Sequence, residues 1–473
     1  MDKPDNLNYL LYPRSVAVIG ASSTPGRVGY TIINNLLQSH YPGRLYPINP
    51  NIQETLGIKA YPSITAVSDD IDLVMIAIQP KSVANIIDRC ATKKVKVAII
   101  HSAGFSEVGK EGKKLEGEVL KIARKNGIRV IGPNTQGIIN TSANLMALSL
   151  NFPTVKSLSR GKGIAFICQT GYFYWDWVFR HPELGLVKAV DLGNMSDLSH
   201  TDFLQNFGDD PQTQLIALQI EEIRDGTRFL ELSSHITESK PIIALKAGRT
   251  QSGTRAIASH TGSLAGNDTV YDTAFKQAGI IRAYDMDELV DFTKTLSYLS
   301  PLPSGNRVAI ITFSGAAAAL AADACEEHGM QVAQLSQSTT ERIGKILPAW
   351  AAISNPIDLF QSPEVDQKMA HTLTIEALFA DPNVDAIMII ALMTVLHEPF
   401  DIFDILMARI KQGLRKPIVI SGVRDEQGSK RWSILEANGI TTYSSIQRAM
   451  KSLAIAYSRY RYLNTKDKAS NTY

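Results

Sequence analysis

The sequence predicts an α/β protein made of three consecutive Rossmann-like or flavodoxin-like domains, each built around a parallel sheet. Two observations indicate this class. Short β-branched apolar runs alternate with helical patterns along all 473 residues, as in parallel βαβ units. Three blocks of the chain also open in the same way, with a strand, a turn of small residues and a helix. The three turns read "GASSTPGRVG", "CQTGYFYW" and "FSGAAAAL".

The elements follow this scheme in order. The predicted first domain, 1–150, opens with the strand "SVAVIGAS" and the helix "YTIINNLLQSH", and continues through "LYPINP", "IDLVMIAIQP", "VKVAIIHSAGF" and "IRVIGPN". The second, 158–300, opens at "GKGIAFICQTG" and includes "VKAVDLGN", "LIALQIEEI" and "PIIALKAGR". The third, 304–473, opens at "RVAIITFSG" and runs through "VDAIMIIALM" and "KPIVISG". Stretches rich in Pro, Gly and Ser at 152–163 and 301–306 are the predicted linkers.

Composition excludes several classes of protein. Hydrophobic residues make up 44% of the chain and charged residues 20%, as in a soluble globular protein. The net charge of +2 gives no general attraction to nucleic acid or a membrane. The three cysteines are far apart and form no CxxC pair, which argues against disulfides and a zinc site and fits a cytoplasmic protein. The N-terminal residues lack the apolar core of a signal peptide.

The turn after the first strand, "VIGASSTPGRVG", suggests a nucleotide cradle. Its glycines, Gly20, Gly26 and Gly29, do not have GxGxxG spacing, and the chain contains no Walker-type phosphate loop. On spacing alone, a phosphate-bearing cofactor and a purely structural turn are equal alternatives. An NAD-type dehydrogenase is a hypothesis that rests on this turn only. Asn49 and Pro50 end the next strand, where a ribose would lie, but a plain strand-ending turn is slightly favoured there.

The stretch "KAGRTQSGTRAIASHTGSLAG" begins at a strand end and contains His260. It lacks a hydrophobic anchor before Leu264, so we predict a long loop, and long ordered loops tend to be functional. Taken alone, a surface role for His260 is favoured over a catalytic one. Glu221 and Glu222 follow another strand, where neighbouring side chains point to opposite faces. One of the two can therefore enter a site while the other is solvated. A solvated pair is the more common arrangement.

Nine segments in order resemble the NDP-forming acyl-CoA synthetases, which include the ADP-forming acetyl-CoA synthetases of archaea. Succinyl-CoA synthetase is a more distant relative. The segments are "SVAVIGASSTPGRVG", "YPINP", "SAGFSEVG", "GPNTQGIIN", "DLGN", "IEEIRDG", "KAGRT", "SHTGSLAG" and "SNPIDLF". The resemblance implies that the first domain binds coenzyme A. The implied contacts are Gly20, Ser22, Pro25, Gly26, Asn49, Pro50, Ile78, Pro80, Ser102, Ala103, Gly104 and Asn134.

The resemblance also implies a phosphoryl carrier. His260 would be phosphorylated transiently, and Glu221, at the family's "IEG" position, would orient its ring. Phosphate would bind at two helix starts, one at Thr170 and Gly171, the other at Gly315 and Ala316. An imidazole nitrogen is nucleophilic near neutral pH, which suits a carrier. The small residues around it, Ser259, Thr261, Gly262 and Gly266, are the expected hinge.

The family also needs an ATP-grasp module that binds ATP or ADP and Mg²⁺, and no such segment is recognisable here. The expectation is therefore the α subunit of an ADP-forming acyl-CoA synthetase, acting with an ATP-grasp β subunit on a small carboxylic acid or its acyl-CoA. It would interconvert acyl-CoA, ADP and phosphate with the acid, ATP and CoA. The alternative is a non-catalytic regulatory module of the same family that binds CoA or acyl-CoA.

Two motifs depart from the family. "CQTGY" replaces Ser-Gln-Ser-Gly-Ala, so Cys168 and Tyr172 are expected to change the pocket. "GPNTQG" replaces "GPNCLG", which places Thr135 and Gln136 near the thiol end of CoA. These changes indicate an altered acyl substrate, with a polar or charged acyl group as one option, or a weakened enzyme.

Overall fold

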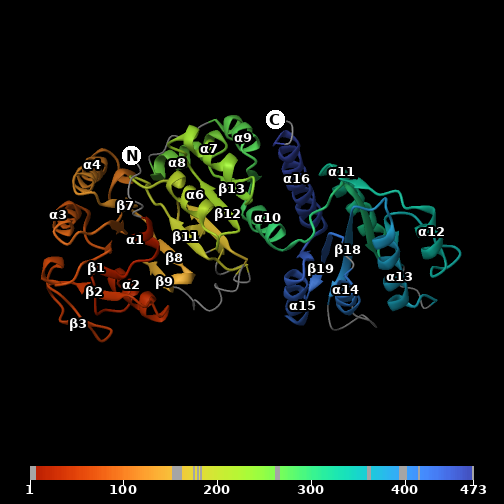
Figure 1. Cartoon of the computed structure of the whole chain (residues 1–473), viewed down its shortest axis with the longest axis horizontal. Helices are drawn as coiled ribbons and strands as arrows, with labels where there is room; N and C mark the ends of the chain where they lie inside the picture. The colour runs from red at the N-terminus through yellow and green to blue at the C-terminus, as the bar shows by residue number, and fades with distance from the viewer. Residues whose placement is uncertain are drawn as a thin grey trace. The chain divides into compact units, whose positions relative to one another are not determined.

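The computed structural model describes residues 7–151, 162–173, 176–177, 181, 184–261, 267–359, 364–393, 402–413, 416–424 and 426–470. The chain divides into two compact units, Met1–Asp285 and Met286–Tyr473 (Figure 1). Among the described residues, unit 1 contains two large sheets and the two-stranded sheet β3-β4, and unit 2 contains a third large sheet. The α/β class predicted from the sequence, with parallel sheets, is confirmed.

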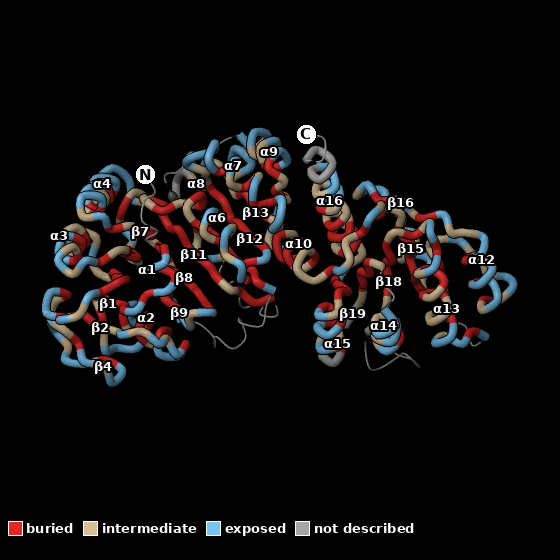
Figure 2. The backbone as a smooth tube through the Cα atoms, in the orientation of Figure 1, coloured by how far each residue is buried: buried red, intermediate tan, exposed pale blue. Residues whose placement is uncertain are grey.

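The first sheet of unit 1 is parallel, with strand order β2-β1-β5-β6-β7. Every residue of β1, β5 and β6 is buried, which explains their continuous apolar runs. Figure 2 shows buried residues gathered along the strands and exposed residues on the outer helices. Burying each Val, Leu or Ile side chain contributes about 1.5–3 kcal/mol. The strands are β1 (Ser15–Ile19), β2 (Arg44–Ile48), β5 (Leu73–Ile76), β6 (Val97–Ile100) and β7 (Arg129–Ile131). The helices are α1 (Leu7–Leu11), α2 (Val28–Gln38), α3 (Pro80–Ala91) and α4 (Lys110–Lys125), and the short elements are β3 (Glu54–Thr55), β4 (Ile58–Lys59), η1 (Ile64–Ala66), η2 (Ser106–Val108) and η3 (Thr141–Ala143).

The second sheet of unit 1 has the order β14-β13-β12-β10-β11-β8-β9. Its first five strands in this order are parallel, and β8 and β9 extend it as an antiparallel hairpin, so residues 137–148 pair with the second sheet. The strands are β8 (Gly137–Asn140), β9 (Leu145–Leu148), β10 (Ile164–Cys168), β11 (Lys188–Asp191), β12 (Leu215–Ile220), β13 (Ile242–Lys246) and β14 (Ile281–Ala283). The helices are α6 (His200–Asp209), α7 (Gly226–Ile236), α8 (Gln251–Thr261) and α9 (Asp268–Gln277).

Unit 2 has a parallel sheet of order β16-β15-β18-β19-β20, and β17 pairs with the end of β15. It includes α10, which precedes the stretch 301–306 and packs on the last helix, α16. The strands are β15 (Arg307–Thr312), β16 (Gln331–Val332), β17 (Ile357–Asp358), β18 (Ala386–Met393), β19 (Ile418–Arg424) and β20 (Thr441–Tyr443). The helices are α10 (Met286–Tyr298), α11 (Gly315–Glu327), α12 (Gln337–Gly344), α13 (Gln367–Ala380), α14 (Ile402–Lys411), α15 (Glu426–Ala437) and α16 (Ile446–Ser470).

All three sheets repeat one strand order. Counted along each sheet's own parallel strands, the order is 2-1-3-4-5, as in flavodoxin-like folds. In such sheets the connections leave the first strand and the third strand in opposite directions, and ligands bind outside the carboxyl ends of these two strands. In the second sheet this point lies between β10 and β12, and in the first sheet between β1 and β5. The predicted small-residue turns are therefore at the positions where this fold holds ligands.

One local prediction was wrong. Residues 251–261, expected to form a loop, are helix α8. Thr250 caps it, because its hydroxyl accepts the Gly253 N–H at 3.1 Å and its carbonyl accepts the Thr254 N–H at 2.8 Å. Ile257 anchors the helix against the backbone, since a Cβ on Gly248 would lie 2.4 Å from its Cδ1. Ser259 and Thr261 therefore belong to a helix, while Gly262 and Gly266 lie outside the described residues.

Within the described residues, no helix combines the length and the apolar character needed to cross a membrane.

Candidate functional site

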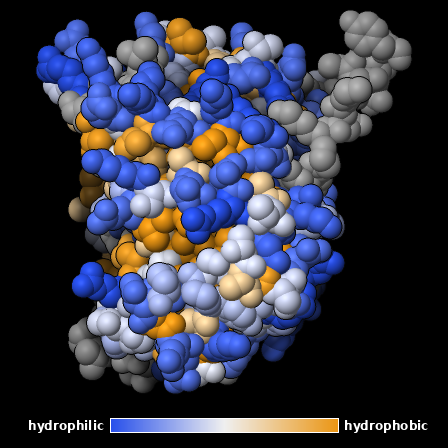
Figure 3. All heavy atoms as spheres, turned by 90° about the vertical axis from the view of Figure 1, so that its left-hand side faces the viewer, coloured by the Kyte–Doolittle hydropathy of each residue, from blue (hydrophilic) through white to orange (hydrophobic). Residues whose placement is uncertain are grey.

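Several of the residues that the resemblance assigns to CoA binding lie along the carboxyl edge of the first sheet. Gly20, Asn49, Pro50 and Ile78 line a cavity of about 310 Å³ at the ends of β1, β2 and β5. Gly20 has a φ of +88°, and a Cβ there would lie 2.3 Å from the Ala77 carbonyl oxygen, so only glycine fits this turn. Figure 3 views this end of unit 1 and shows hydrophobic residues gathered among hydrophilic ones.

Four more residues of this set, Pro80, Ser102, Gly104 and Asn134, lie along the same edge. The Ser102 hydroxyl donates to the Ile78 carbonyl at 2.5 Å, and the Asn134 N–H donates to the Ser102 carbonyl at 3.0 Å. A Cβ on Gly104 would touch Pro80, the first residue of α3. The structure thus brings Gly20, Ile78, Ser102 and Asn134 together in sequence along one edge.

Three other predicted CoA contacts are placed differently. Pro25, Gly26 and Ala103 are exposed in loops. They line neither this cavity nor the second one, described below, at the same end of the strands. Ser22 is half-buried, and its carbonyl accepts the Thr55 hydroxyl at 2.8 Å.

Arg89 of α3 also lines the CoA-side cavity. The motif comparison missed this residue because a lone Arg inside a helix carries no turn signal. It brings a guanidinium suited to phosphate groups to a largely apolar lining.

A second cavity, of about 280 Å³, joins the end of the first sheet to the second sheet. Asn134 and Gln136 line it from one side, and Thr170 and Gly171, which follow β10, line it from the other. A Cβ on Gly171 would lie 2.0 Å from Cγ of Gln136, so the glycine allows the two segments to touch. The cavity therefore has residues of the expected CoA set and of the predicted phosphate turn in one lining.

The structure shows how the two motifs that depart from the family, "CQTGY" and "GPNTQG", lie relative to this cavity. Gln136 and Tyr172 line it, and Tyr172 is 65% exposed at its rim. Thr135 does not line it, because its hydroxyl donates to the Asp191 carbonyl at 2.5 Å and accepts the Gly137 N–H at 3.0 Å. Cys168 is buried with its thiol near the Val190 carbonyl, and burial raises its pKa, so the thiol stays protonated.

Glu221 follows β12 at the same edge of the sheet. It is 6% exposed, whereas Glu222 is half-buried and forms an ion pair with Arg224 at 3.3 Å. The alternation expected for this pair is therefore observed. The Gln169 side chain fixes the segment, since its Oε1 accepts the N–H groups of Glu221 at 2.6 Å and Glu222 at 3.0 Å.

Lys246 ends the neighbouring strand β13 beside these groups. Its ammonium lies 4.8 Å from the centre of the Tyr271 ring, and burial lowers its pKa against the opposing charges of Asp268 and Glu221. The edge formed by β12 and β13 thus holds a buried carboxylate with a cation nearby.

Asp191 ends β11 on the other side of β10 and lines the second cavity. Burial, the largest effect, raises its pKa to about 7, and the charge of Glu221 adds to the rise, against hydrogen bonds from the Gln136 and Gly193 N–H groups. The motif comparison included Asp191 in "DLGN" but assigned it no role. The strand-end position in "VKAVDLGN" was the signal that could have found it.

His260 lies in the last turns of α8, and its side chain is outside the described residues. The helix begins just after β13 and contacts η2, the turn that follows β6 in the first half of the unit. Gly315 and Ala316 are exposed in the first turn of α11, in unit 2, where the Ser314 side chain accepts the Ala317 N–H. The structure thus places His260's helix, Glu221 and Thr170 in one unit, and the second predicted phosphate turn in the other.

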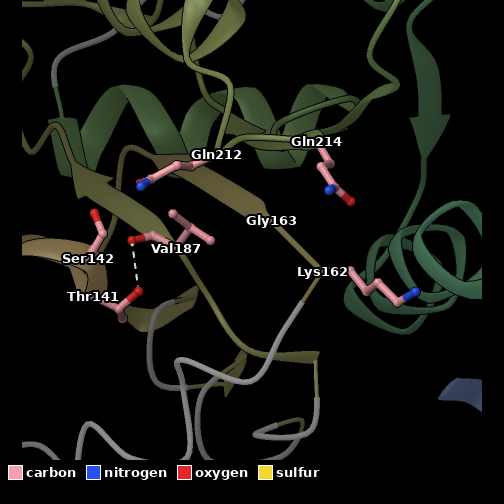
Figure 4. Close-up of a pocket in the computed structure, with 7 residues that line it drawn as sticks. All are labelled: Thr141, Ser142, Lys162, Gly163, Val187, Gln212 and Gln214. Atoms are coloured by element: carbon pink, nitrogen blue, oxygen red, sulfur yellow. Dashed lines mark hydrogen bonds between the residues drawn. The ribbon is translucent and has the colours of Figure 1, made fainter.

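A further cavity, of about 420 Å³, lies at the opposite edge of the second sheet. Figure 4 shows its polar lining, with the Thr141 hydroxyl donating to the Val187 carbonyl at 3.3 Å. Gly163, Val187 and Gln214 directly precede strands, so this cavity is at their amino ends. Because this fold binds ligands at the carboxyl ends, we assign the chemistry to the other two cavities.

Comparisons with known proteins agree with this arrangement. Residues 14–141 match a CoA binding domain, 160–296 a succinyl-CoA ligase-like flavodoxin domain, and 308–469 a ligase-CoA domain. The α subunit of acetate–CoA ligase (ADP-forming) II of Pyrococcus furiosus is 38% identical over 92% of this chain and 94% of its own length. Acetate–CoA ligase (ADP-forming) of Methanocaldococcus jannaschii is 44% identical over 75% of this chain, which spans 49% of that protein.

A solved structure supports the same assignment. The dinucleotide-forming acetyl-coenzyme A synthetase 1 of Candidatus Korarchaeum cryptofilum, in complex with phosphate and ADP, superposes with a TM-score of 0.86. It is 32% identical and covers 98% of this chain and 99% of its own. Fold and site together define an acid–CoA ligase, with coenzyme A as a substrate. The chain belongs to the ADP-forming acyl-CoA synthetases, the family that its motifs resemble.

Proposed function

We propose that this chain is the α subunit of its ligase and carries a phosphoryl group on His260 between two reaction sites. The observation that carries the proposal is the shared edge of the second sheet. Thr170, Glu221 and helix α8 all follow parallel strands at that edge, and a cavity connects it to Asn134 on the CoA side. This is the arrangement that a transfer from a thioester to phosphate and then to an imidazole requires.

In the proposed cycle, a phosphate oxygen attacks the thioester carbonyl carbon, the C–S bond breaks, and CoA leaves as the thiol. The product is an acyl phosphate. A nitrogen of His260 then attacks phosphorus, the P–O bond to the acyl group breaks, and the carboxylate leaves. Phosphohistidine finally passes its phosphoryl group to ADP, which gives ATP. Each step is reversible, so metabolite levels set the direction.

The described residues support these steps by position and charge. The N–H groups at Thr170 and Gly171 open the helical segment after β10 and suit the phosphate oxygens. Glu221 is buried one strand away and is the proposed acceptor for the second ring nitrogen of His260, which would fix the tautomer. Gly315 and Ala316 would provide the second N–H terminus, from α11.

The nucleotide step requires a second protein in this proposal. Several relatives carry the words "subunit alpha" in their names, and this chain spans 94% and 97% of the two from Pyrococcus furiosus. We infer a partner β subunit of the ATP-grasp type that holds ADP or ATP with Mg²⁺. The hetero-oligomer would act in the cytoplasm on a small carboxylic acid.

The test is phosphoryl labelling. The chain and its partner are incubated with ATP labelled at the γ-phosphate, and acid-labile, base-stable label on this chain is measured. We expect His260→Ala to abolish the label and to reduce the overall rate by more than about a thousandfold, as for loss of other catalytic nucleophiles. The matched control is His235→Ala, because this histidine of α7 has an 85% exposed side chain. Equal labelling of His260→Ala and the control would refute the carrier role.

A further inference from the structure

The cavity between Asn134 and Thr170 has a polar floor. Its large apolar side chains, Leu150 and Tyr172, are 41% and 65% exposed and so stand at the rim. The other residues that line it are Asn134, Gln136, Gln169, Thr170, Gly171, Asp191, Gly193 and Asn194. An acyl group that lies between the CoA side and the phosphate turn therefore meets hydrogen-bonding groups at depth.

Asp191 presents acceptors on this floor. It is 1% exposed, with Oδ2 accepting the Gln136 N–H at 2.7 Å and Oδ1 accepting the Gly193 N–H at 3.1 Å. Each oxygen of a carboxyl group can accept a second hydrogen bond. Among the largest influences on this carboxyl group, the charge of Glu221 is repulsive. Such a group is stabilised by a donor and destabilised by a second anion.

Asn194 adds another acceptor. Its amide nitrogen donates to Glu107 Oε2 at 2.6 Å, and to Ser106 Oγ and Glu116 Oε2 at 3.2 Å each. These three acceptors fix the orientation of the amide. The other end, Oδ1, is buried and has no hydrogen-bond partner among the described residues. With Asn194 only 8% exposed, this oxygen is an unmet acceptor at the cavity wall.

We propose that Asp191 and Asn194 select an acyl group that carries a hydrogen-bond donor, such as a hydroxyl or ammonium group, and exclude dicarboxylic acids. This inference rests on the proposed function, because it takes the cavity as the acyl site. A site built around buried acceptors rejects an analogue that leaves them unpaired far more strongly than an apolar pocket rejects a missing methylene. Above pH 7, where Asp191 is ionised, a second carboxylate would meet two negative charges, those of Asp191 and Glu221.

Binding to the full-length chain tests the selection without the partner subunit. Calorimetric titration with hydroxyacetyl-CoA and propionyl-CoA compares a hydroxyl with a methyl group of similar size, and malonyl-CoA supplies the second carboxylate. We expect hydroxyacetyl-CoA to bind at least about tenfold more tightly than propionyl-CoA, and malonyl-CoA to bind more weakly than either. Equal affinities for hydroxyacetyl-CoA and propionyl-CoA, within threefold, would overturn the inference.

Two variants assign the effect to Asp191. Asp191→Ala should abolish the hydroxyl preference, and Asp191→Asn should improve malonyl-CoA binding about tenfold. An unchanged ranking in a folded Asp191→Ala chain would contradict the assignment. If a variant does not fold, the ranking by the unmodified chain still decides. Failure of CoA itself to bind would refute the proposed function and this inference together, whereas tight CoA binding without selectivity refutes only the inference.

Discussion

At the scale of single residues, the chain places costly groups at the carboxyl ends of strands in both large sheets of unit 1. Asp191 and Glu221 are both buried carboxyl groups on strands that flank β10. Gly20 and Gly171 are positions where any side chain would collide with neighbouring atoms. Natural proteins accept such local costs mainly where function requires them. Three of these four residues, Gly20, Gly171 and Asp191, line the two cavities at the carboxyl ends of the strands.

The raised pKa of Asp191 predicts a pH dependence of stability. Between its ordinary value of 3.8 and about 7, the folded chain keeps a proton that the unfolded chain has lost. The free energy of unfolding of unit 1 must then fall as pH rises through this window, by up to about 1.4 kcal/mol per pH unit from this group.

Asp191→Asn removes that contribution. Its stability should decline less than that of the unmodified chain between pH 4 and 7 and run parallel to it above pH 8. Denaturant titrations followed by tryptophan fluorescence measure this, with Trp350 and Trp432 of unit 2 replaced by Phe so that unit 1 gives the signal. Parallel curves over the whole range would show that the carboxyl group titrates normally.

At the scale of elements, the small-residue turns were predictable because the same pattern of residues occurs at the start of all three blocks. A buried β-branched strand followed by glycine, serine or alanine and then a helix is readable from residue order alone. Helix α8 was not, because it has one apolar anchor, Ile257, and many small polar residues. Its start signal was present in Thr250, whose side chain caps the third helical N–H. Arg89 and Asn194 could not be assigned from sequence, since only tertiary packing brings them to a cavity.

Helix α8 should therefore depend on its cap. Replacing Thr250 with Ala removes the hydroxyl that accepts the Gly253 N–H and should cost about 1 kcal/mol, concentrated in this helix. Hydrogen exchange of residues 251–261 should accelerate, and phosphorylation of His260 should slow. Thr250→Ser keeps the acceptor and is the matched control. If Thr250→Ala and Thr250→Ser exchange equally, the cap does not hold the helix.

At the scale of the whole molecule, the chain is two compact units, and α10 belongs to the second. Asp291 of α10 accepts two hydrogen bonds from Arg448, at 2.5 and 2.9 Å, and Thr295 bonds the Tyr443 hydroxyl at 2.6 Å. The helix also buries Leu289 and Phe292. The stretch 301–306, rich in Pro, Gly and Ser, therefore follows helix α10, which packs within unit 2.

Two fragments test this division. Residues 286–473 should fold alone and unfold cooperatively. Residues 304–473 lack α10 and should be less stable by at least about 3 kcal/mol, because Leu289 and Phe292 each contribute about 1.5–3 kcal/mol when buried. Urea denaturation of both fragments gives the difference. Equal stabilities would place α10 outside the folded unit.

The contact between α8 and η2 has a thermodynamic consequence. One side of this contact is the turn that follows β6, whose Ser106 hydroxyl accepts a hydrogen bond from Asn194 of the second cavity, and the other is the helix that contains His260. Suppose that phosphorylation of His260 changes the affinity for CoA by some factor. Linkage then requires CoA to change the equilibrium for phosphorylation by the same factor. CoA binding and phosphorylation of His260 would thus be coupled through one packed turn. Measuring the effect of either event on the other would give the size of this coupling.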